Sequence, residues 1–325
     1  MEYKKKLTGL VCLIGVLALV YGGTLVFDPE RVNSRNASFV WLNAEGQDRA
    51  DRIEISRAGS EPITLIRKNN EWFVPREGID FPAKQGRVED LFRLLSTRGA
   101  YPPRASTAAS HERLGLTEET ASRIVIRGGA GAYPLLDLLI GDPDATGKEI
   151  YLRQNNQNEV RSGESGLSSY AGGSPASWCN LRLFPDSPGR SLNVDMIQGL
   201  RVDFPAPGAD TGPAAPMVLV RSAGGWTLEG GSEPPDTQRV ESYIRSILDA
   251  EGEDFAVSVR PEEPVFNDGR ITLNTGDGGT HTIRLGPPGA ENRRNAAVSL
   301  SPYVYTLGEW TVNRLFREAA YFVTR

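Results

Sequence analysis

The chain has 325 residues, of which 39% are hydrophobic and 24% are charged, and its formal net charge is −5. This length suffices for two ordinary domains, and the composition is that of folded globular protein rather than of a disordered chain. The basic residues form no long run beyond the N-terminus, which argues against nucleic-acid binding, because that function needs a concentrated basic face.

The first predicted element is a membrane anchor. Lys4, Lys5 and Lys6 precede an uncharged apolar stretch, residues 7–27, which has about the 20 residues that a helix needs to cross a hydrocarbon core. A signal peptide has a shorter apolar core and a cleavage site, so cleavage is the lesser alternative. Because lysines stay on the cytoplasmic side, we predict a single-pass protein of the bacterial inner (cytoplasmic) membrane with its bulk in the periplasm. Residues 1–29 form the predicted cytoplasmic tip and transmembrane anchor.

Beyond the anchor, the sequence repeats itself. A strand, a polar turn and a second strand opened by Trp occur at 63–74 and again, with the same spacing, at 217–228. An amphipathic helix follows in both copies, at 88–95 and 240–247, with apolar residues at i, i+3, i+4 and i+7. Paired strands with Gly-rich turns come next in each copy.

These patterns predict an α+β fold, in which an N-terminal transmembrane helix is followed by two tandem repeats of a β-hairpin/helix/antiparallel-sheet unit. The first repeat unit is expected at 30–190 and the second at 191–325. Each unit is expected to close on a helical segment, because Trp178 to Phe184 keeps the spacing of Trp310 to Phe316. The matched Trp residues are expected in the core, where Trp is usually largely buried.

Arginines at matched positions are candidate contact residues, because core packing does not require arginine. The pairs are Arg67 with Arg221, Arg93 with Arg245, and Arg182 with Arg314. A solvated or structurally paired arginine is the plainer interpretation, and contact with a partner protein is the alternative.

Motifs for catalysis or for cofactors are missing from the sequence. His111 and His281 are the only histidines, and they lie in non-equivalent parts of the two repeats, so zinc spacing does not occur. Residues 141–148 depart from a phosphate loop in their glycine spacing, and Arg153 stands where a calcium loop needs glutamate. A polar β-turn is the better interpretation of this stretch. We therefore predict a protein that is not an enzyme and that holds no cofactor or metal.

Several of these features resemble the domain of unknown function 4340 family. They are the strand opened by Trp72, the helix after it, the phrase His-Glu-Arg-Leu-Gly-Leu at 111–116, the strand that ends at Gly141, and the strand of Tyr151. The second unit lacks the Leu-Gly-Leu phrase and has Pro-Glu-Glu-Pro at 261–264 instead. The resemblance implies an extracytoplasmic protein encoded beside an ABC transporter permease and a gliding-motility-type auxiliary subunit, without established catalytic residues.

The leading hypothesis is a membrane-anchored extracytoplasmic accessory or scaffold subunit of an ABC-transporter-type complex. Its predicted partners are the membrane, through residues 7–27, a permease and another extracytoplasmic subunit. The alternatives are a module that binds cell-envelope polysaccharide or another ligand, with Tyr170, Tyr303 or Tyr305 stacking on sugar rings, and a hydrolase with dispersed carboxylates. The candidate partner-contact residues are Arg67, Arg221, Arg93, Arg245, Tyr303 and Tyr305.

Overall fold

The computed structural model describes residues 14, 15, 17, 38–129, 133–185, 191–205, 215–263 and 265–323. The chain divides into two compact units. The first consists of Met1–Trp72 and Gln85–Pro175, and the second of Phe73–Lys84 and Ala176–Arg325. The segment Phe73–Lys84 lies inside the first sequence repeat but is part of the second compact unit. The limits 30–190 and 191–325 stay a prediction about the sequence repeat.

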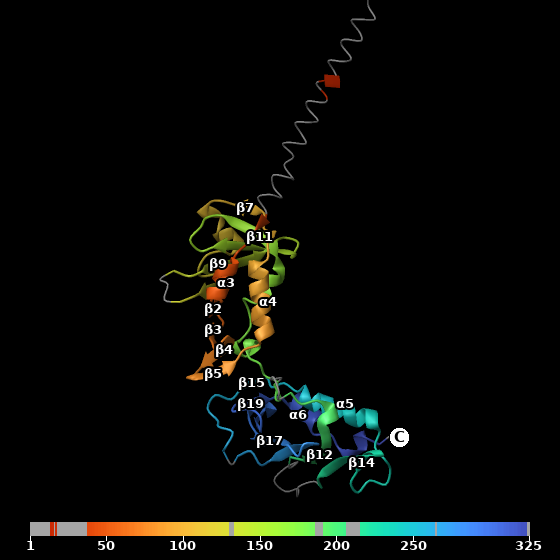
Figure 1. The fold of residues 1–325 in the computed structure, drawn as a ribbon. Helices are drawn as coiled ribbons and strands as arrows, with labels where there is room; N and C mark the ends of the chain where they lie inside the picture. Colours follow the sequence, from red (N-terminus) through yellow and green to blue (C-terminus); the bar gives the residue numbers. More distant parts are fainter. Residues whose placement is uncertain are drawn as a thin grey trace, which may run out of the picture. The chain divides into compact units, whose positions relative to one another are not determined.

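The first large sheet has nine strands in the order β5-β4-β3-β2-β8-β9-β10-β11-β7 (Figure 1). Along β2 and β3 every second residue is buried, as the alternation of apolar residues predicts. Helix α4 (Gln85–Ser96) buries Val88, Leu91, Phe92 and Leu95 on one face. The strands are β2 (Arg52–Ser56), β3 (Ile63–Lys68), β4 (Glu71–Arg76), β5 (Ile79–Pro82), β7 (Pro103–Ala105), β8 (Ser122–Arg127), β9 (Leu136–Pro143), β10 (Glu149–Gln154) and β11 (Val160–Glu164).

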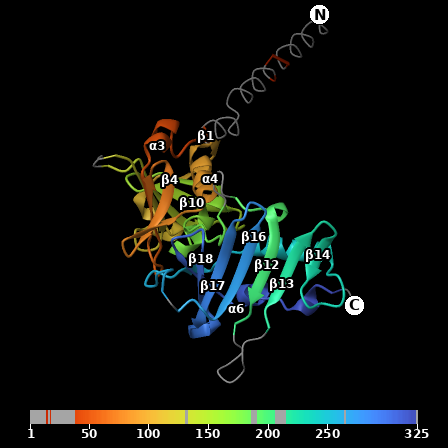
Figure 2. The ribbon, with the colours of Figure 1, turned by 60° about the horizontal axis from the view of Figure 1, so that its bottom comes forward.

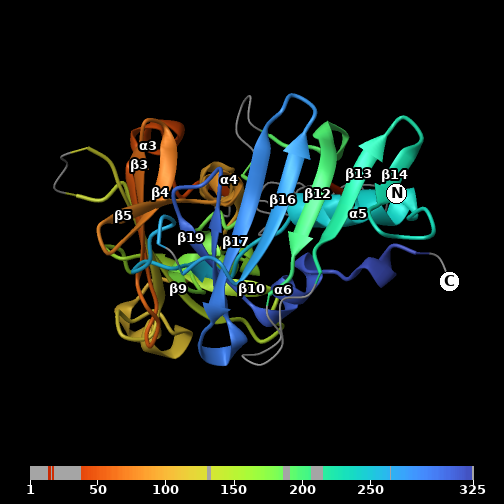
Figure 3. The ribbon, with the colours of Figure 1, turned by 90° about the horizontal axis from the view of Figure 1, so that it is seen from below.

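The second large sheet has eight strands in the order β14-β13-β12-β16-β17-β18-β19-β15. Strands β14, β13, β12, β16 and β17 run side by side in Figure 2. Helix α5 (Thr237–Leu248) lies behind these strands in Figure 3 and buries Val240, Tyr243, Ile244 and Ile247. Helix α6 (Glu309–Leu315) follows the last strand. The strands are β12 (Ile197–Asp203), β13 (Met217–Ser222), β14 (Gly225–Leu228), β15 (Asp254–Phe255), β16 (Gly269–Thr275), β17 (Thr280–Pro288), β18 (Arg294–Val298) and β19 (Val304–Leu307).

The two sheets share one topology. With β5 set aside, each strand of the nine-stranded sheet has a counterpart at the same position in the eight-stranded sheet. In chain order, again without β5, α4 and α5 each follow the third strand of their sheet. In both units a residue ahead of the sheet donates a backbone hydrogen bond to the last turn of this helix or to the residues just after it. The backbone of Leu42 donates to the carbonyl of Leu95 at 3.0 Å, and that of Leu183 donates to the carbonyl of Ala250 at 2.9 Å. The helices predicted at 88–95 and 240–247 are present as α4 and α5.

The predicted fold class, α+β with an N-terminal transmembrane helix, is wrong. Antiparallel sheets of nine and eight strands dominate, and a two-stranded sheet of β1 (Ser38–Phe39) and β6 (Gly99–Ala100) accompanies them. Among the described residues helices are few, because in each unit one 12-residue helix is followed by a run of hairpins. In the part of the chain that is described, no helix has both the length and the apolarity to cross a membrane. The predicted span at 7–27 lies outside the described residues, apart from Ile14, Gly15 and Leu17.

The predicted match between Trp178 and Trp310 is also wrong. Trp310 lies in α6, directly after β19, whereas the element directly after β11 is the 3₁₀ helix Ser165–Ser169. Trp178 comes later and is fully buried, but Trp310 is 70% exposed. The shared Trp-to-Arg-to-Leu spacing therefore joins segments at different places in the fold, and only one of these tryptophans belongs to the core.

Candidate functional site

The first pair of matched arginines has an internal use in both units. The guanidinium of Arg67 donates to the carbonyl of Asp48, at the end of α3 (Ala44–Arg49), at 3.2 Å. Arg221 donates to the carbonyl of Asp195, in the 3₁₀ helix Val194–Met196, at 3.4 Å. Each arginine thus connects the second strand of its unit to the short helix that precedes the first strand. A role of these two residues in partner contact stays a prediction.

The second pair of matched arginines lies on the surface. Arg93 is exposed on α4 and forms an ion pair with Asp90, three residues earlier in the helix. Arg245 is exposed on α5. Surface ion pairs within a helix contribute little stability, about 0.3–0.5 kcal/mol. Because both side chains are exposed, both are accessible to a partner.

The three candidate tyrosines have different surroundings. Tyr305 is 2% exposed, and burial raises the pKa of its hydroxyl to about 12. The guanidinium of Arg87 covers the ring of Tyr170, at 5.1 Å from the ring centroid. Tyr303 lines a groove of about 740 Å³ in the second unit, but its hydroxyl donates to the carbonyl of Asp80 at 2.9 Å. The buried ring of Tyr305 has no open face for a sugar.

Three of the segments that carry the family resemblance, namely the 111–116 phrase, β9 and β10, meet in the first unit. Leu116 and Leu139 are fully buried in one cluster, and Leu114 and Tyr151 pack against it. Gly141 lets the chain come this close, because a Cβ at this position would lie 2.3 Å from the carbonyl oxygen of Leu114. The 111–116 phrase is thus the segment that packs on β9 and β10.

Two further side chains hold this segment in place. Nε2 of His111 lies 3.1 Å from the carbonyl oxygen of Asn158. Arg153, which is 7% exposed, donates to the carbonyls of Leu116 and Asn155 at 3.0 Å. Desolvation lowers the pKa of Arg153, and these carbonyls provide the acceptors that a buried guanidinium needs. The sequence offered no sign of this role, because the acceptors are backbone atoms.

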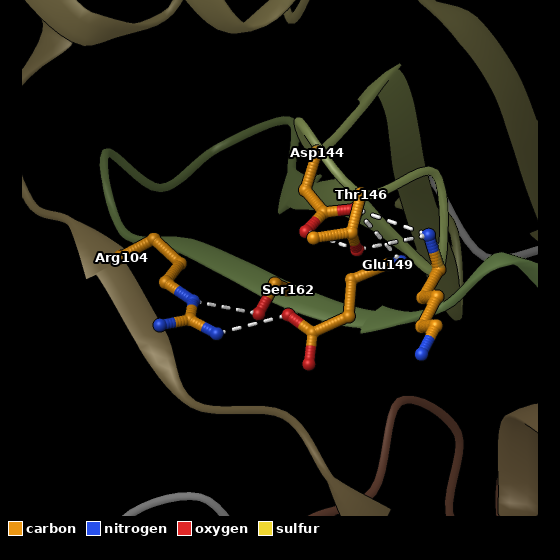
Figure 4. A network of polar contacts seen from close by, with 6 residues as sticks. Arg104, Asp144, Thr146, Glu149 and Ser162 are labelled. Atoms are coloured by element: carbon orange, nitrogen blue, oxygen red, sulfur yellow. Dashed lines mark hydrogen bonds and ion pairs between the residues drawn. The ribbon is translucent and has the colours of Figure 1, made fainter.

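A polar cavity of about 360 Å³ lies beside the cluster, and we call it the motif pocket. It combines two arginines and two carboxylates with one tyrosine and small apolar side chains. Figure 4 shows Arg104 pointing from β7 toward Ser162 and Glu149. The residues that line the motif pocket are Arg104, Ala105, Arg113, Leu114, Asp144, Ala145, Glu149 and Tyr151.

Hydrogen bonds fix three charged groups of the motif pocket, those of Arg104, Asp144 and Glu149. Arg104 donates from Nε to Oγ of the buried Ser162 at 2.8 Å and from Nη2 to Oε2 of Glu149 at 2.9 Å. The hydrogen bond with Ser162, followed by the hydrogen bond and the positive charge of Arg104, lowers the pKa of Glu149. Oδ1 of Asp144 accepts from the backbone N–H groups of Lys148 and Glu149, both at 3.1 Å, and hydrogen bonds of this kind lower the pKa of Asp144. Both carboxyl groups therefore stay ionised at neutral pH.

The bonds of Asp144 also define the predicted polar turn. The turn connects β9, which ends at Pro143, to β10, which begins at Glu149. Thr146 donates its hydroxyl to Oδ2 of Asp144 at 2.9 Å. The side chain of Asp144 thus organises the turn from within, and the prediction of a polar β-turn in this stretch is confirmed.

Substitution of Gly141 tests the packing of the motif. We expect Gly141→Ala to destabilise the first unit by about 1–3 kcal/mol, because the new methyl group would overlap the Leu114 carbonyl and force the 111–116 segment away. Urea unfolding of the full chain measures the change. Gly166→Ala is the matched control, since a Cβ at Gly166 meets no atom within 4 Å. Equal unfolding midpoints for the two variants would contradict the packing described.

The ion pair of Glu149 predicts a pH dependence. Because the native pKa of Glu149 is lowered from 4.5, its contribution to stability is present above about pH 4.5 and is lost as the pH falls through the native pKa. Glu149 is partly exposed, so the contribution is about 1 kcal/mol or less. We expect Glu149→Gln to be less stable than wild type at about pH 7, and the difference to shrink as the pH falls below about 4.5 and through the lowered native pKa. A difference that grows toward acid pH would contradict the lowered pKa.

A second surface lies at the end of the second unit. Trp310 is 70% exposed on α6, with the guanidinium of Arg314 at 4.6 Å from the centroid of its ring. Tyr321 is 43% exposed. The segment between these two aromatic residues forms one wall of a groove of about 580 Å³, to which it contributes Val312 and Phe316. We call Trp310, Arg314, Tyr321 and this groove the C-terminal surface.

Comparison with models of protein families finds a match, which includes the residues of the motif pocket. The family model described as Domain of unknown function (DUF4340) matches residues 72–265, which is more than half of the chain. The chain belongs to the DUF4340 family. The DUF4340 match begins at Trp72 in β4, includes the whole motif pocket and ends at Val265 in the second unit, so it extends over parts of both large sheets. It confirms the resemblance inferred from the sequence. Neither the curated proteins nor the solved structures contain a match.

Proposed function

We propose that the chain is an extracytoplasmic accessory subunit that acts by contact with another protein, in a complex of the ABC-transporter type. The C-terminal surface carries this proposal. Soluble proteins rarely expose large apolar side chains beside an apolar groove unless a partner covers them. Trp, Tyr and Arg are the residues that contribute most to interface energies, and Trp310, Tyr321 and Arg314 supply all three.

The pKa shifts of the described carboxyl groups favour a protein that contacts a partner over a hydrolase. Each described carboxyl group with a displaced pKa, namely Glu119, Asp144, Glu149 and Asp277, has it lowered. A glycosidase needs a general acid whose pKa is raised, so that it holds a proton at neutral pH. These four groups are the opposite of such an acid and serve as hydrogen-bond acceptors.

Purification of the complex tests the proposed function. The full chain, with an affinity tag, is solubilised from its native membranes in a mild detergent, and the proteins that accompany it are determined by mass spectrometry. We expect a permease and a second extracytoplasmic protein in the eluate. Recovery of the tagged chain alone and monomeric would contradict the proposal. A phosphatase reporter that is active only outside the cytoplasm, fused after Arg325, tests the extracytoplasmic location separately.

A further inference from the structure

We propose that the motif pocket binds a saccharide. The lining of the pocket contains charged residues of both signs. Arg104 and Arg113 contribute two positive charges, and Asp144 and Glu149 contribute two negative charges, so the formal sum is zero. Because the two signs balance, the lining offers neither a small anion nor a small cation a net electrostatic attraction. A ligand without net charge and with many hydrogen-bonding groups is the one that this lining fits best.

The lining of the pocket also places a hydrogen-bond donor beside an acceptor. A sugar hydroxyl donates one hydrogen bond and accepts others, so it needs a donor and an acceptor side by side. The guanidinium of Arg104 and the carboxylate of Glu149, 2.9 Å apart, provide such a pair, and each group has hydrogen-bonding capacity beyond their mutual bond. Leu114, Ala105 and the ring of Tyr151 add apolar surface for the C–H face of a sugar ring.

The pocket is formed before any ligand enters. Ser162, which is fully buried, holds Arg104, and the turn holds Asp144. Leu114 and Tyr151 are fixed because they pack on the buried cluster around Leu116. A site whose groups are already in place loses less conformational entropy on binding, which allows a small neutral ligand to bind with useful affinity.

The structure assigns this site to the first unit alone. In the second unit the stretch that corresponds to the 111–116 phrase is 261–264, which offers neither Arg113 nor Leu114. The turn between β17 and β18 holds the 3₁₀ helix Ala290–Asn292 in place of the Asp144 turn. We therefore expect one saccharide per chain. This inference does not rest on the proposed accessory function, because the C-terminal surface belongs to the other unit.

Calorimetric titration of the full chain tests the proposal. The protein is kept in a detergent without a sugar head group, and the probes are maltotriose and the trisaccharide of N-acetylglucosamine. We expect at least one of the two to bind with about one site per chain, and Arg113→Ala to weaken that binding at least about tenfold, because hydrogen bonds to a charged group are lost. Arg93→Ala, a change of the same kind at another exposed position of the first unit, is expected to leave the affinity within about twofold.

Three outcomes would overturn the proposal. They are the failure of both trisaccharides to bind at millimolar concentration, equal binding by Arg113→Ala and wild type, and binding of inorganic phosphate or glycine in place of the sugars. Thermal unfolding of each variant separates loss of the site from loss of the fold. Arg104→Lys, which keeps the charge but not the two-pronged contact with Ser162 and Glu149, provides a second variant, for which we also expect weaker binding.

Discussion

Phe81→Ala is expected to destabilise the second unit by about 3–5 kcal/mol, the usual cost of removing a buried phenylalanine from a core. Phe81 is 1% exposed and stacks on Phe255, with ring centroids 4.5 Å apart and an angle of 12° between the planes. Its ring centroid also lies 5.3 Å from that of Tyr303. The substitution would leave a cavity between aromatic rings that cannot close it without moving.

The second unit is the one expected to lose stability, because Phe81 lies in a segment that packs with that unit. Phe81 belongs to the segment Phe73–Lys84, which lies inside the first repeat but is part of the second compact unit. A second contact of this segment is the ion pair of Arg76 with Asp254, in which Nη2 and Oδ2 are 3.2 Å apart. The segment is therefore a structural part of the second unit, although 91 residues (from 85 to 175) separate it from the rest of that unit in the sequence.

Chemical denaturation of the full chain measures the effect of Phe81→Ala. Tryptophan fluorescence follows both units, because Trp41 and Trp72 are buried in the first unit and Trp178 and Trp226 in the second. Ile79→Ala, on the same hairpin but 37% exposed, is the control, and we expect it to cost under about 1 kcal/mol. Similar losses for the two variants would show that the Phe81 ring is not part of the core of the second unit.

Under the proposed function, Trp310→Ala is expected to remove most of the binding to the proposed partner protein. Truncation of a central interface tryptophan costs about 2–4 kcal/mol, which corresponds to a loss of affinity of roughly 30-fold to 1,000-fold. Because Trp310 is 70% exposed, the free energy of unfolding should change little. Purification of the tagged variant under the conditions used for the wild type measures the loss of the partner.

Val220→Ala is the matched control for Trp310→Ala. Val220 is an apolar residue of the same unit, 37% exposed on β13, and it is not part of the C-terminal surface. We expect the control to retain the partner. Full recovery of the partner with Trp310→Ala would mean that the C-terminal surface is not the contact.

The sequence was sufficient for the elements whose pattern is local. The i, i+3, i+4, i+7 spacing placed α4 and α5, because a helix that covers a sheet buries one stripe. The Trp-opened hairpins were also found, as β3 with β4 and β13 with β14. The predicted proportion of strand to helix was too low, because a single short strand gives only a weak signal in the sequence.

The motif pocket was out of reach of the sequence. Arg104, Glu149 and Ser162 lie on β7, β10 and β11, and they meet only because β11 pairs with both of the other strands. No spacing rule relates such residues. Trp310 was placed in the core for a related reason, because its spacing to Arg314 and Leu315 copied that of Trp178 to Arg182 and Leu183. Exposure of Trp310 follows from its position on the outer side of α6, which only the structure shows.

Photocrosslinking from position 310 tests the proposed function most directly. A photoreactive amino acid replaces Trp310 in the full chain, and cells are irradiated before lysis. We expect a crosslinked product with one membrane-transport protein from position 310, and none when the same amino acid replaces Arg52, an exposed residue of β2 on the first unit. No product from position 310, or the same product from both positions, would contradict the proposal that the C-terminal surface holds a specific partner.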